Sequence, residues 1–438
     1  MRGFVLLLGV AGGLGTTLAY PYVGVLLWSW FTLQQPHEQA YGFVQTAPLN
    51  LIIAVVTLIA WILSRERKTP PSAFIFWMLV IFFVWMTLNS IFAYDPAQSW
   101  PIWDLTWKTL LLGAVIAVTA TSRTRLYTLT WIIVISLFYY GVKGGVFTIL
   151  TGGHFRVGGP AASIIGDNNQ LAVALLMTLP FANYLRSQIA DRRIAGLLLA
   201  GILLTVISII GSYSRGALIG LTALGLLAIL RVRNRFAYLA VACFVIAFIV
   251  QFMPESFFHR MDTISTATQD TSFEGRLYAW QVAFLYASQH FPFGAGFSGL
   301  QLGVIFHQYF PDQPPRAAHS IYFEVLGDQG FIGLGIYLIV LSAAFLECSR
   351  IISVTRGVPE QQWAHDLAIA IQASLFVFCV AGSALSMAYY DLFVIDVAML
   401  LSLREIILLK GKPKRTTWKP SPAVVRPPFL PAEGAEHR

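Results

Sequence analysis

The chain has 438 residues, of which 57% are apolar and only 11% are charged. Soluble domains carry roughly a quarter charged residues, so this composition excludes a soluble enzyme, a disordered regulator and a disulfide-stapled secreted domain. Together with the mean hydropathy of +0.68, it predicts a polytopic membrane protein. The net charge of +8 comes from short basic clusters between apolar runs, which indicates membrane topology rather than a nucleic-acid partner. The three cysteines stand inside apolar runs without a CxxC pair, so we interpret them as small apolar side chains.

Apolar segments of bilayer length recur along the chain. A membrane-spanning helix needs about 20 residues at 1.5 Å each. About twelve segments meet this condition: 3–33, 47–63, 73–93, 106–121, 126–150, 167–185, 194–211, 215–230, 236–253, 320–347, 365–388 and 391–409. The first is too long for one helix, and glycines and Pro21 interrupt it, so one broken span and two short helices both remain open. We expect an all-α polytopic membrane protein without internal repeats.

Basic residues divide unevenly between the alternating loops. Most of the 29 Lys and Arg residues fall on one set of loops, which we group with Arg2 and the C-terminal tail. The opposite set holds only Arg156, Arg215, Arg260, Arg276 and Arg316. Because basic loops stay in the cytoplasm, this asymmetry predicts that both termini are cytoplasmic. The tail from about 411 is rich in Pro and Lys, and we expect it to be disordered.

One loop on the translocated side is unusually long, running from Pro254 to about Ala318. Loops of this length inside a compact structure are usually functional or disordered. Residues 273–291 carry Leu277, Trp280, Phe284 and Tyr286 at the spacing of a helix with one apolar face. The pattern predicts an amphipathic helix at or over the membrane surface.

Two arginines on this side are candidates for anion binding. Arg215 stands in GSYSRGALIG, where one span ends and the next begins, and hydroxyl residues surround it. Its side chain either snorkels to the membrane interface or holds an anion such as a phosphate. Arg276 lies on the predicted loop helix and either pairs locally with Glu274 or joins Arg215 around a diphosphate.

His319 is the candidate base, because it stands where the long loop meets the next span. An unperturbed imidazole titrates near pH 6.5, which suits general base work near neutral pH. Glu324 and Asp328 follow on the same segment, and the sequence leaves open whether either assists His319. No HxxxH, HExxH, DxD, GxSxG or Walker A pattern is present, so we expect no metal site and no cofactor.

A third polar patch covers 154–170. Asp167 is interpreted as a helix cap, while the consecutive Asn168 and Asn169 exceed what a cap requires. We treat Asn168, Asn169, Arg156 and Glu324 as candidate contacts with a glycan or acceptor.

These residues together resemble the O-antigen ligase and polymerase superfamily, most strongly across 200–335. The resemblance consists of Arg215 at a span boundary, a large loop with Arg276, then His319 and Ser320 followed at fixed spacing by Gly330 and Gly333. The segments QPHEQAYGF (35–43), GDNN (166–169) and AHSIYFEVLGDQGFIG (318–333) are similar to one branch, the O-glycosylation ligases associated with the exosortase A system.

The resemblance implies a GT-C-like glycosyltransferase in the bacterial cytoplasmic (inner) membrane, with its active site on the periplasmic side. The donor would be a glycan on undecaprenyl diphosphate, and the acceptor a hydroxyl of a protein or polysaccharide. Arg215 and Arg276 would bind the diphosphate and His319 would activate the acceptor, in a metal-independent reaction that inverts the anomeric centre. The implied organisation is an N-terminal transmembrane bundle at 1–193, an O-antigen ligase-like core at 194–348 with the periplasmic loop at 254–319, C-terminal helices at 349–410 and the tail at 411–438.

Two other functions remain open from the sequence. A polymerase that extends lipid-linked repeat units would share the same motif residues. A lipid or polysaccharide transporter is less favoured, because such proteins often show internal repeats and charged residues within their spans. Neither the glycan nor the acceptor can be identified from the residues.

Overall fold

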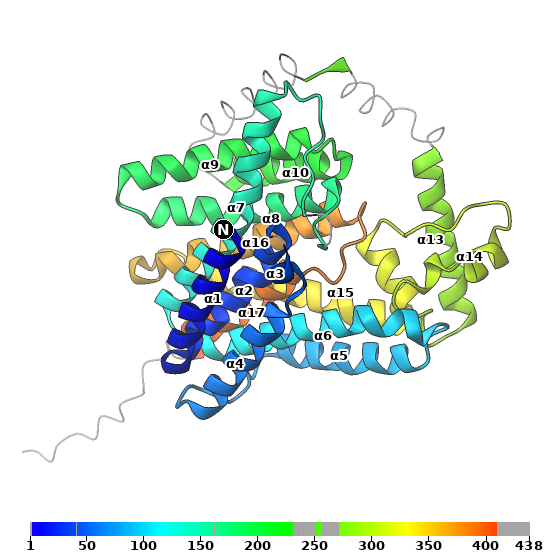
Figure 1. The fold of residues 1–438 in the computed structure, drawn as a ribbon, viewed down its shortest axis with the longest axis horizontal. Coiled ribbons are helices and arrows are strands. Elements are labelled where there is room, and N and C mark those ends of the chain that lie inside the picture. Colours follow the sequence, from blue (N-terminus) through cyan, green and yellow to red (C-terminus); the bar gives the residue numbers. More distant parts are fainter. Residues whose placement is uncertain are drawn as a thin grey trace, which may run out of the picture.

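We describe the fold from a computed structural model of the chain, which describes residues 2–40, 42–160, 163–231 and 271–409, with 236, 240, 243, 247, 251 and 253–255. Within these ranges the chain is built of helices joined by loops (Figure 1). No described residue is assigned to a β-strand. The helices are α1 (Arg2–Ala19), α2 (Pro21–Gln34), η1 (Pro36–Gln39), α3 (Phe43–Thr46), α4 (Leu49–Leu63), α5 (Phe74–Ile91), α6 (Pro96–Thr119), α7 (Arg123–Leu150), α8 (Asn168–Gln188), α9 (Arg192–Gly211), α10 (Arg215–Arg231), α13 (Thr271–Gln289), η3 (Gly299–Gln301), α14 (Gly303–Tyr309), α15 (Ile321–Thr355), η4 (Pro359–Gln361), α16 (Gln362–Gly382), α17 (Asp391–Arg404) and η5 (Glu405–Leu409, a π-helix).

Membrane-spanning helices account for much of this architecture. In the described ranges, seven helical segments are long and apolar enough to cross a bilayer: Arg2–Ala19, Phe74–Ile91, Pro96–Thr119, Arg123–Leu150, Arg192–Gly211, Ile321–Thr355 and Pro359–Gly382. Leu49–Leu63 and Arg215–Ile229 are shorter apolar helices. The sequence predicted about twelve spans. Most of the expected span at 236–253 and the whole tail beyond 409 lie outside the described residues.

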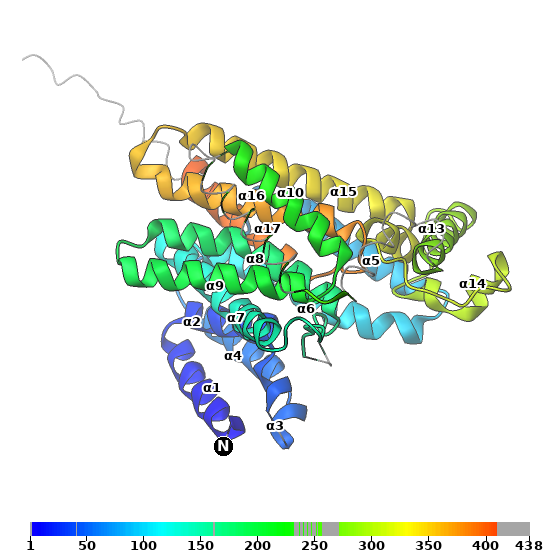
Figure 2. The same ribbon diagram turned by 90° about the horizontal axis from the view of Figure 1, so that it is seen from above.

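The bundle centre is formed by α8 and α17. Nearly every residue from Leu171 to Leu185 and from Leu392 to Leu403 is buried. A helix that is apolar on all sides is expected in the interior of a bundle rather than at its surface. In Figure 2, α8 and α17 lie between α7 and α9 on one side and α15 and α16 on the other.

The first apolar segment forms two helices, because Pro21 begins α2 and ends α1 at the preceding turn. The helices are antiparallel: Gly13 packs against Leu27, and Gly24 packs against Thr17. The turn lies beside the start of α7, where the Tyr22 hydroxyl donates to the carbonyl of Arg125. Residue 2 is therefore at the far end of α1 from the basic loops, which differs from the expectation that Arg2 joins them.

The basic loops of the sequence gather at one end of the bundle. Arg125 donates to both carboxylate oxygens of Glu66, with 2.8 Å from Nη1 to Oε2. Arg67 pairs with Glu405, and Arg123 donates to Gln188 at 3.3 Å. These contacts join loops that are remote in sequence, and we call this the basic end.

Capping residues set the starts of α6 and α8, and only the start of α6 differs from the predicted boundary. The span predicted from 106 begins at Pro96, because the Asp95 carboxylate accepts from the N–H groups of Ala97 and Gln98, and proline suits the first helical position. Asp167 caps α8 as expected, accepting from the Asn169 N–H at 2.9 Å.

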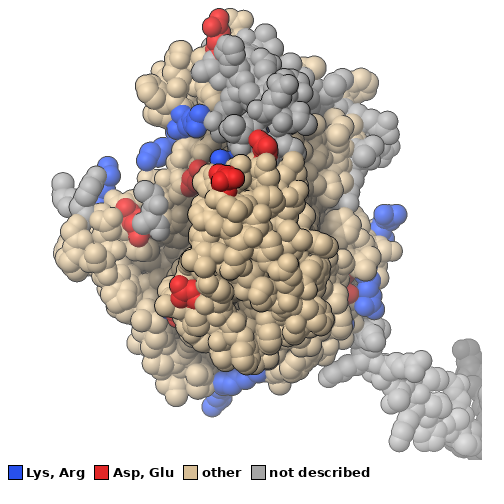
Figure 3. All heavy atoms as spheres, turned by 90° about the vertical axis from the view of Figure 1, so that its right-hand side faces the viewer, with Lys and Arg blue, Asp and Glu red and all other residues tan. Residues whose placement is uncertain are grey.

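The predicted loop helix is present as α13, and its buried face agrees only in part with the expected one, since Tyr286 is buried and Leu277 and Phe284 are not. Ala279, Val282, Ala283 and Tyr286 are buried against α14, η3 and α15, whereas Leu277 and Phe284 are 39% and 52% exposed. Figure 1 shows α13 and α14 as a lobe beside the end of α15. Figure 3 views the molecule from that side and shows few charged side chains, which are separated by broad uncharged areas. Small side chains make up much of the buried face of α13, because they allow this helix to approach α15 closely.

Candidate functional site

A polar cavity of about 630 Å³ lies at the end of the bundle opposite the basic loops. Its walls come from α2, η1, α4, α6, the start of α8, η3, the start of α15 and the 383–391 segment. The polar and charged side chains among them include Gln35, His37, Glu38, Asn50, Lys108, Asp167, Gln170, Gln301, His319, Glu324, Asp328 and Asp391. A concave site of this size with several convergent polar groups is suited to binding a ligand.

His319 is held at the cavity wall by its own backbone. Its φ is +44°, in the left-handed region that side-chain-bearing residues seldom adopt. Its N–H donates to Ser386 Oγ at 2.9 Å, and the carbonyl of the preceding Ala318 accepts from Trp280 Nε1 at 2.7 Å. The turn before α15 is thus tied to α13 and to the 383–390 loop, which sets the direction of the imidazole.

The surroundings of His319 favour its neutral form. Burial lowers the pKa of the imidazole, and the charges of Arg276 and Arg316 lower it further. Asp167 acts in the opposite direction and raises that pKa. A ring that stays neutral near neutral pH can accept a proton, which is the property a general base needs.

Arg276 and Arg316 both lie close enough to His319 for their charges to act on its ring. Gly275 makes this approach feasible: a Cβ at residue 275 would lie 2.6 Å from Arg316 Nη1. The Arg316 guanidinium therefore rests against the α13 backbone one residue from Arg276. The sequence reasoning did not assign Arg316 to the site, although its place among the few arginines of the translocated loops was a usable signal.

Arg215 begins α10 at the same end of the bundle. Ser214 caps the helix by accepting from the Ala217 N–H at 3.3 Å, and a Cβ on Gly216 would lie 3.5 Å from Ala384 Cβ. The start of α10 thus packs on the loop that holds His319 through Ser386. Arg215 is half-buried there and is not one of the residues that line the polar cavity.

The start of α8 completes this arrangement. Asn168 Nδ2 donates to the Ser212 carbonyl at 2.6 Å, and Gln170 Nε2 donates to the Ser386 carbonyl at 3.2 Å. The first turns of α8, α10 and α15 are thereby joined around one loop. Helix N-termini carry partial positive charge, so their convergence favours an anion at this end.

The other predicted glycan contacts lie apart from the cavity wall. Asn169 donates to Asp167 Oδ1 at 2.8 Å, and the Arg156 guanidinium lies 5.9 Å from the centre of the Tyr213 ring. Asn168, Asn169 and Arg156 are not among the lining residues, whereas Asp167 and Gln170 are. A sugar-binding role for the first three stays a prediction.

Glu324 and Asp328 line the cavity and also hold two loops. Glu324 Oε2 accepts from the Ala388 N–H at 2.9 Å. Asp328 accepts from the Ser298 N–H at 3.0 Å and from the Tyr389 hydroxyl at 3.2 Å. The two carboxylates therefore position the walls of the cavity, and the sequence pattern carried no sign of these long-range partners.

Gly330 produces the break in α15 that makes these contacts feasible. Its φ of 69° and ψ of −174° interrupt the helix, which frees the carbonyls of residues 327, 328 and 329. Ala295 N–H donates to the first carbonyl at 2.8 Å and Gly296 N–H to the second at 3.0 Å. Trp85 Nε1 donates to the third at 2.9 Å.

Gly333, the second glycine of the motif, also has a packing reason. A Cβ there would lie 2.2 Å from Gln329 Cβ and 3.0 Å from Trp85 Nε1. The spacing of His319, Gly330 and Gly333 thus corresponds to one structural unit: a histidine just before the start of a helix and a kink that locks the helix to the neighbouring loop.

Comparison with known families agrees with this unit. Residues 200–338 match the family model described as O-antigen ligase. That O-antigen ligase domain contains Arg215, Arg276, Arg316, His319 and the kink at Gly330. The match supports placement in the O-antigen ligase superfamily and implies a membrane enzyme of the ligase or polymerase type that uses a lipid-linked glycan donor.

The rest of the chain is less informative. Residues 1–190 match a family of unknown function (DUF5935). No curated protein is similar enough to this chain to count as a match. The N-terminal family nevertheless contributes to the site, because α2, α4, α6 and the start of α8 form part of the cavity wall.

Proposed function

We propose that this protein is an O-glycosylation ligase of the inner membrane. It transfers a glycan from undecaprenyl diphosphate to an acceptor hydroxyl on the periplasmic face. The O-antigen ligase domain at 200–338 supports the class of reaction. The single observation that carries the catalytic assignment is the position of His319 in the cavity wall beside two arginine charges.

The chemistry requires a base, positive charge and a leaving group. Neutral His319 accepts the proton of the acceptor hydroxyl as its oxygen bonds to the anomeric carbon. The bond from that carbon to the diphosphate oxygen breaks from the opposite face, so the anomeric centre inverts. Arg276 and Arg215 stabilise the negative charge that grows on the departing lipid diphosphate, and Arg316 adds a third cation near His319. No metal ion takes part in this mechanism.

Orientation follows from the two ends of the bundle. Arg125, Arg67 and Arg123 belong to the basic end, and the cavity lies at the other end. The positive-inside rule then assigns the basic end to the cytoplasm and the cavity to the periplasm. A donor already activated as a diphosphate needs no nucleotide in that compartment.

The assignment to the O-glycosylation ligase branch of the superfamily is supported by three sequence segments. The cavity is lined by His37 and Glu38 from QPHEQAYGF, by Asp167 from GDNN, and by His319 from AHSIYFEVLGDQGFIG. These are the segments that resemble the O-glycosylation ligases associated with the exosortase A system. Their meeting in one cavity favours that branch over a polymerase of repeat units.

The experiment compares His319→Ala with His307→Ala, a histidine of α14 outside the cavity wall, at matched membrane levels. Glycoproteins and surface polysaccharides are analysed by mass spectrometry and gel. We expect the glycan to disappear from its acceptor with His319→Ala and to remain with His307→Ala. Undiminished transfer by His319→Ala would reject the base, and a ladder of growing lipid-linked chains made by the wild type would favour the polymerase.

A further inference from the structure

The residues that line the polar cavity include His319 but none of the arginines assigned to the diphosphate. Arg276 and Arg316 lie close enough for their charges to act on the His319 ring, and Arg215 begins α10 at the same end of the bundle. His319 is therefore the group that the cavity and the arginines have in common. If these arginines hold the diphosphate, as proposed above, the cavity receives a different part of the reactants.

The stereochemistry of an inverting transfer indicates which part this is. The acceptor oxygen and the departing diphosphate oxygen must lie on opposite faces of the anomeric carbon, and the base must contact the acceptor hydroxyl. Because His319 lines the cavity and the arginines do not, the cavity is on the acceptor side of the reaction. Much of its wall comes from α2, η1, α4 and α6, which lie within residues 1–190.

Contacts with aromatic residues hold η1 in place in this wall. The Tyr140 hydroxyl of α7 donates to the Gln34 carbonyl and accepts from Gln39 Nε2 at 2.7 Å. The His37 ring stacks on the fully buried Phe31, with ring centroids 6.0 Å apart and ring planes 8° from parallel. A wall that is already ordered loses little conformational entropy when a ligand binds.

Two buried polar atoms of the same wall, His37 Nδ1 and Asn50 Oδ1, have no hydrogen-bond partner among the described residues. Most buried polar atoms in proteins are hydrogen-bonded. Glu38 adds a carboxylate, which lies 3.7 Å from His37 Nε2. All three residues line the cavity, so a ligand there can supply the partners. We call His37, Glu38 and Asn50 the N-terminal wall.

Carboxyl groups dominate the charge of the cavity. Lys108 is the only Lys or Arg among the described lining residues, and it pairs with Asp104. Burial lowers the pKa of both His37 and His319, so neither ring adds positive charge near neutral pH. The acidic lining residues are Glu38, Asp167, Glu324, Asp328 and Asp391. A phosphate or carboxylate on a ligand would meet these groups, and the one lining cation is already paired.

The mixture of side chains suits a peptide better than a sugar. A sugar ring stacks on an exposed aromatic face, but Trp28 is only 3% exposed and the Tyr389 hydroxyl is engaged in a hydrogen bond within the protein. On α6, the apolar Ile102 and Leu105 line the cavity together with Thr106. Apolar and hydrogen-bonding groups therefore alternate along the wall, as the side chains and backbone of a peptide require.

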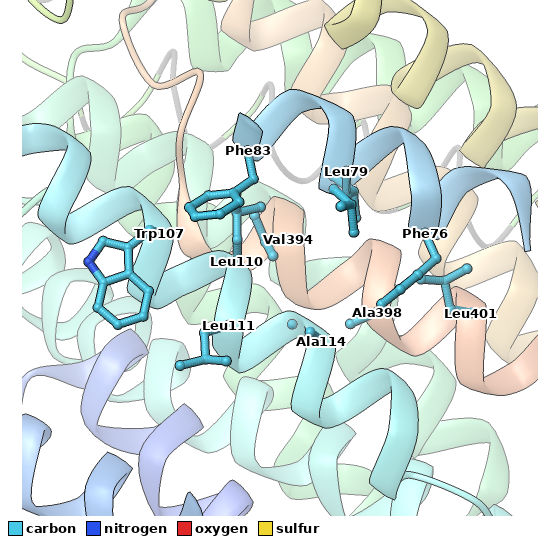
Figure 4. Close-up of a pocket in the computed structure, with 12 residues that line it drawn as sticks. Phe76, Leu79, Phe83, Trp107, Leu110, Leu111, Ala114, Val394, Ala398 and Leu401 are labelled. Atoms are coloured by element: carbon cyan, nitrogen blue, oxygen red, sulfur yellow. The ribbon is translucent and has the colours of Figure 1, made fainter. Parts of the chain in front are cut away.

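The second large space lacks such groups. Figure 4 shows a groove of about 320 Å³ between α5, α6 and α17, on which apolar side chains such as Leu79, Leu110 and Val394 converge. The indole N–H of Trp107, which also lines it, donates to Asp104 Oδ1 at 3.1 Å. A segment that carries a hydroxyl and polar flanks therefore fits the polar cavity and not this groove.

We propose that the polar cavity binds the acceptor as a peptide segment, and that the N-terminal wall selects uncharged or basic residues around the acceptor Ser or Thr; this rests on the proposed function. The region of the chain that matches a family of unknown function thereby determines acceptor specificity. An acceptor that carries phosphate or carboxylate groups beside its hydroxyl is disfavoured by the carboxyl groups of the cavity.

Two synthetic peptides test this selection: one Ser-containing sequence flanked by Lys and the same sequence flanked by Glu. Their binding to the purified protein is measured without donor. We expect the wild type to bind the Lys-flanked peptide roughly ten-fold more tightly, and Glu38→Lys to remove most of this preference. Asp312→Lys changes an exposed carboxylate outside the cavity wall and should keep the preference. Equal binding of both peptides by the wild type, or equal effects of the two variants, would overturn the proposal.

Donor binding and photo-crosslinking give independent readouts. Glu38→Lys should keep binding of undecaprenyl diphosphate within a few-fold of wild type, and a loss of donor binding as large as the loss of peptide preference would overturn the acceptor assignment. A Lys-flanked peptide with a benzophenone group should label η1 or α6 of the wild type, and labelling confined to other segments would overturn it. Failure of both peptides to bind, with binding of a neutral oligosaccharide, would overturn the peptide in favour of a polysaccharide acceptor.

Peptide binding requires no chemistry, so its result is separable from the proposed base. Normal transfer by His319→Ala would reject the catalytic role and leave the measured peptide preference standing. Loss of transfer by His319→Ala, with no peptide preference in the wild type, would reject the selection and leave the base standing.

Discussion

Gly330→Ala tests whether the kink in α15 holds the site together. The backbone at this position has φ +69° and ψ −174°, a conformation essentially restricted to glycine, and the strain of alanine there costs about 1–3 kcal/mol. The added Cβ would also lie 2.6 Å from the Pro292 carbonyl oxygen and 2.8 Å from the Phe293 carbonyl carbon. Backbone atoms at such distances must move, which disturbs the neighbouring loop.

The loop movement adds to the cost. It would stretch the hydrogen bonds that Ala295 and Gly296 donate to α15, each worth about 1 kcal/mol net. We therefore expect Gly330→Ala to destabilise the protein by about 3–5 kcal/mol in total. Transfer activity should fall as well, because Ser298 and Asp328 lose their register beside the cavity.

Gly335→Ala is the matched control, because it lies on the same helix and a Cβ there meets no atom within 4 Å. It should be neutral or stabilising by up to about 1 kcal/mol, as expected for glycine to alanine inside a helix. Thermal and denaturant unfolding in detergent, followed by tryptophan fluorescence, measures both variants, and glycan transfer is assayed in parallel. If Gly330→Ala were as stable and active as Gly335→Ala, the structural reading of the motif would be refuted.

Three further predictions follow from the site and the basic end. Burial lowers the pKa of His319, and the charges of Arg276 and Arg316 lower it further. Arg316→Gln should therefore raise that pKa and move the acidic limb of the pH–rate profile to higher pH. An acidic limb that stays in place or moves to lower pH would contradict this prediction. Asn89 is fully buried; its amide nitrogen donates to the Asp328 carbonyl at 2.5 Å, and its amide oxygen accepts from the Gly294 N–H at 2.8 Å. Asn89→Ala should therefore lower the free energy of unfolding by about 1–3 kcal/mol. A loss near zero would show that this bridge is dispensable. The hydrogen bonds from Arg125 lower the pKa of Glu66, so the ion pair stabilises the fold at pH values above the usual Glu pKa, and this stabilisation is lost as pH falls through the lowered pKa. Glu66→Gln should therefore lower the free energy of unfolding by less than about 1 kcal/mol at neutral pH, and the difference from wild type should vanish in acid. Melting curves of both proteins at neutral and at acidic pH measure this difference.

Local signals predicted most of the helices. Long apolar runs separated by basic loops located α4, α5, α7, α8, α9, α10 and α17 to within a few residues, and α15 and α16 less closely at their C-terminal ends. The Asp167 cap was expected from its position. The start of α6 was missed because the polar stretch after Asp95 hid a helix that a cap and a proline begin. The direction of α1 was missed because a single Arg2 carries little topological information compared with the packing of Gly13 and Gly24.

The candidate site was only partly predictable. His319 and the arginines stand out because positive charge is rare on translocated loops and because of the spacing to Gly330. Ser386 and Tyr389 gave no such signal, since their importance depends on bonds to His319 and Asp328 across more than fifty residues of sequence. The buried face of α13 was only partly assigned: Tyr286 is buried as expected, whereas Leu277 and Phe284 are exposed. Small residues form much of the close contact in their place.

The most direct measurement of the central claim separates donor binding from transfer in His319→Ala. Binding of undecaprenyl diphosphate and single-turnover glycan transfer are measured on the same purified preparation, with wild type and Arg276→Ala alongside. A base that acts only on the acceptor predicts that His319→Ala keeps donor binding within a few-fold and loses transfer by roughly 10²–10⁴-fold, whereas Arg276→Ala weakens binding itself. Transfer by His319→Ala at the wild-type rate, or a loss of binding as large as its loss of transfer, would contradict the claim.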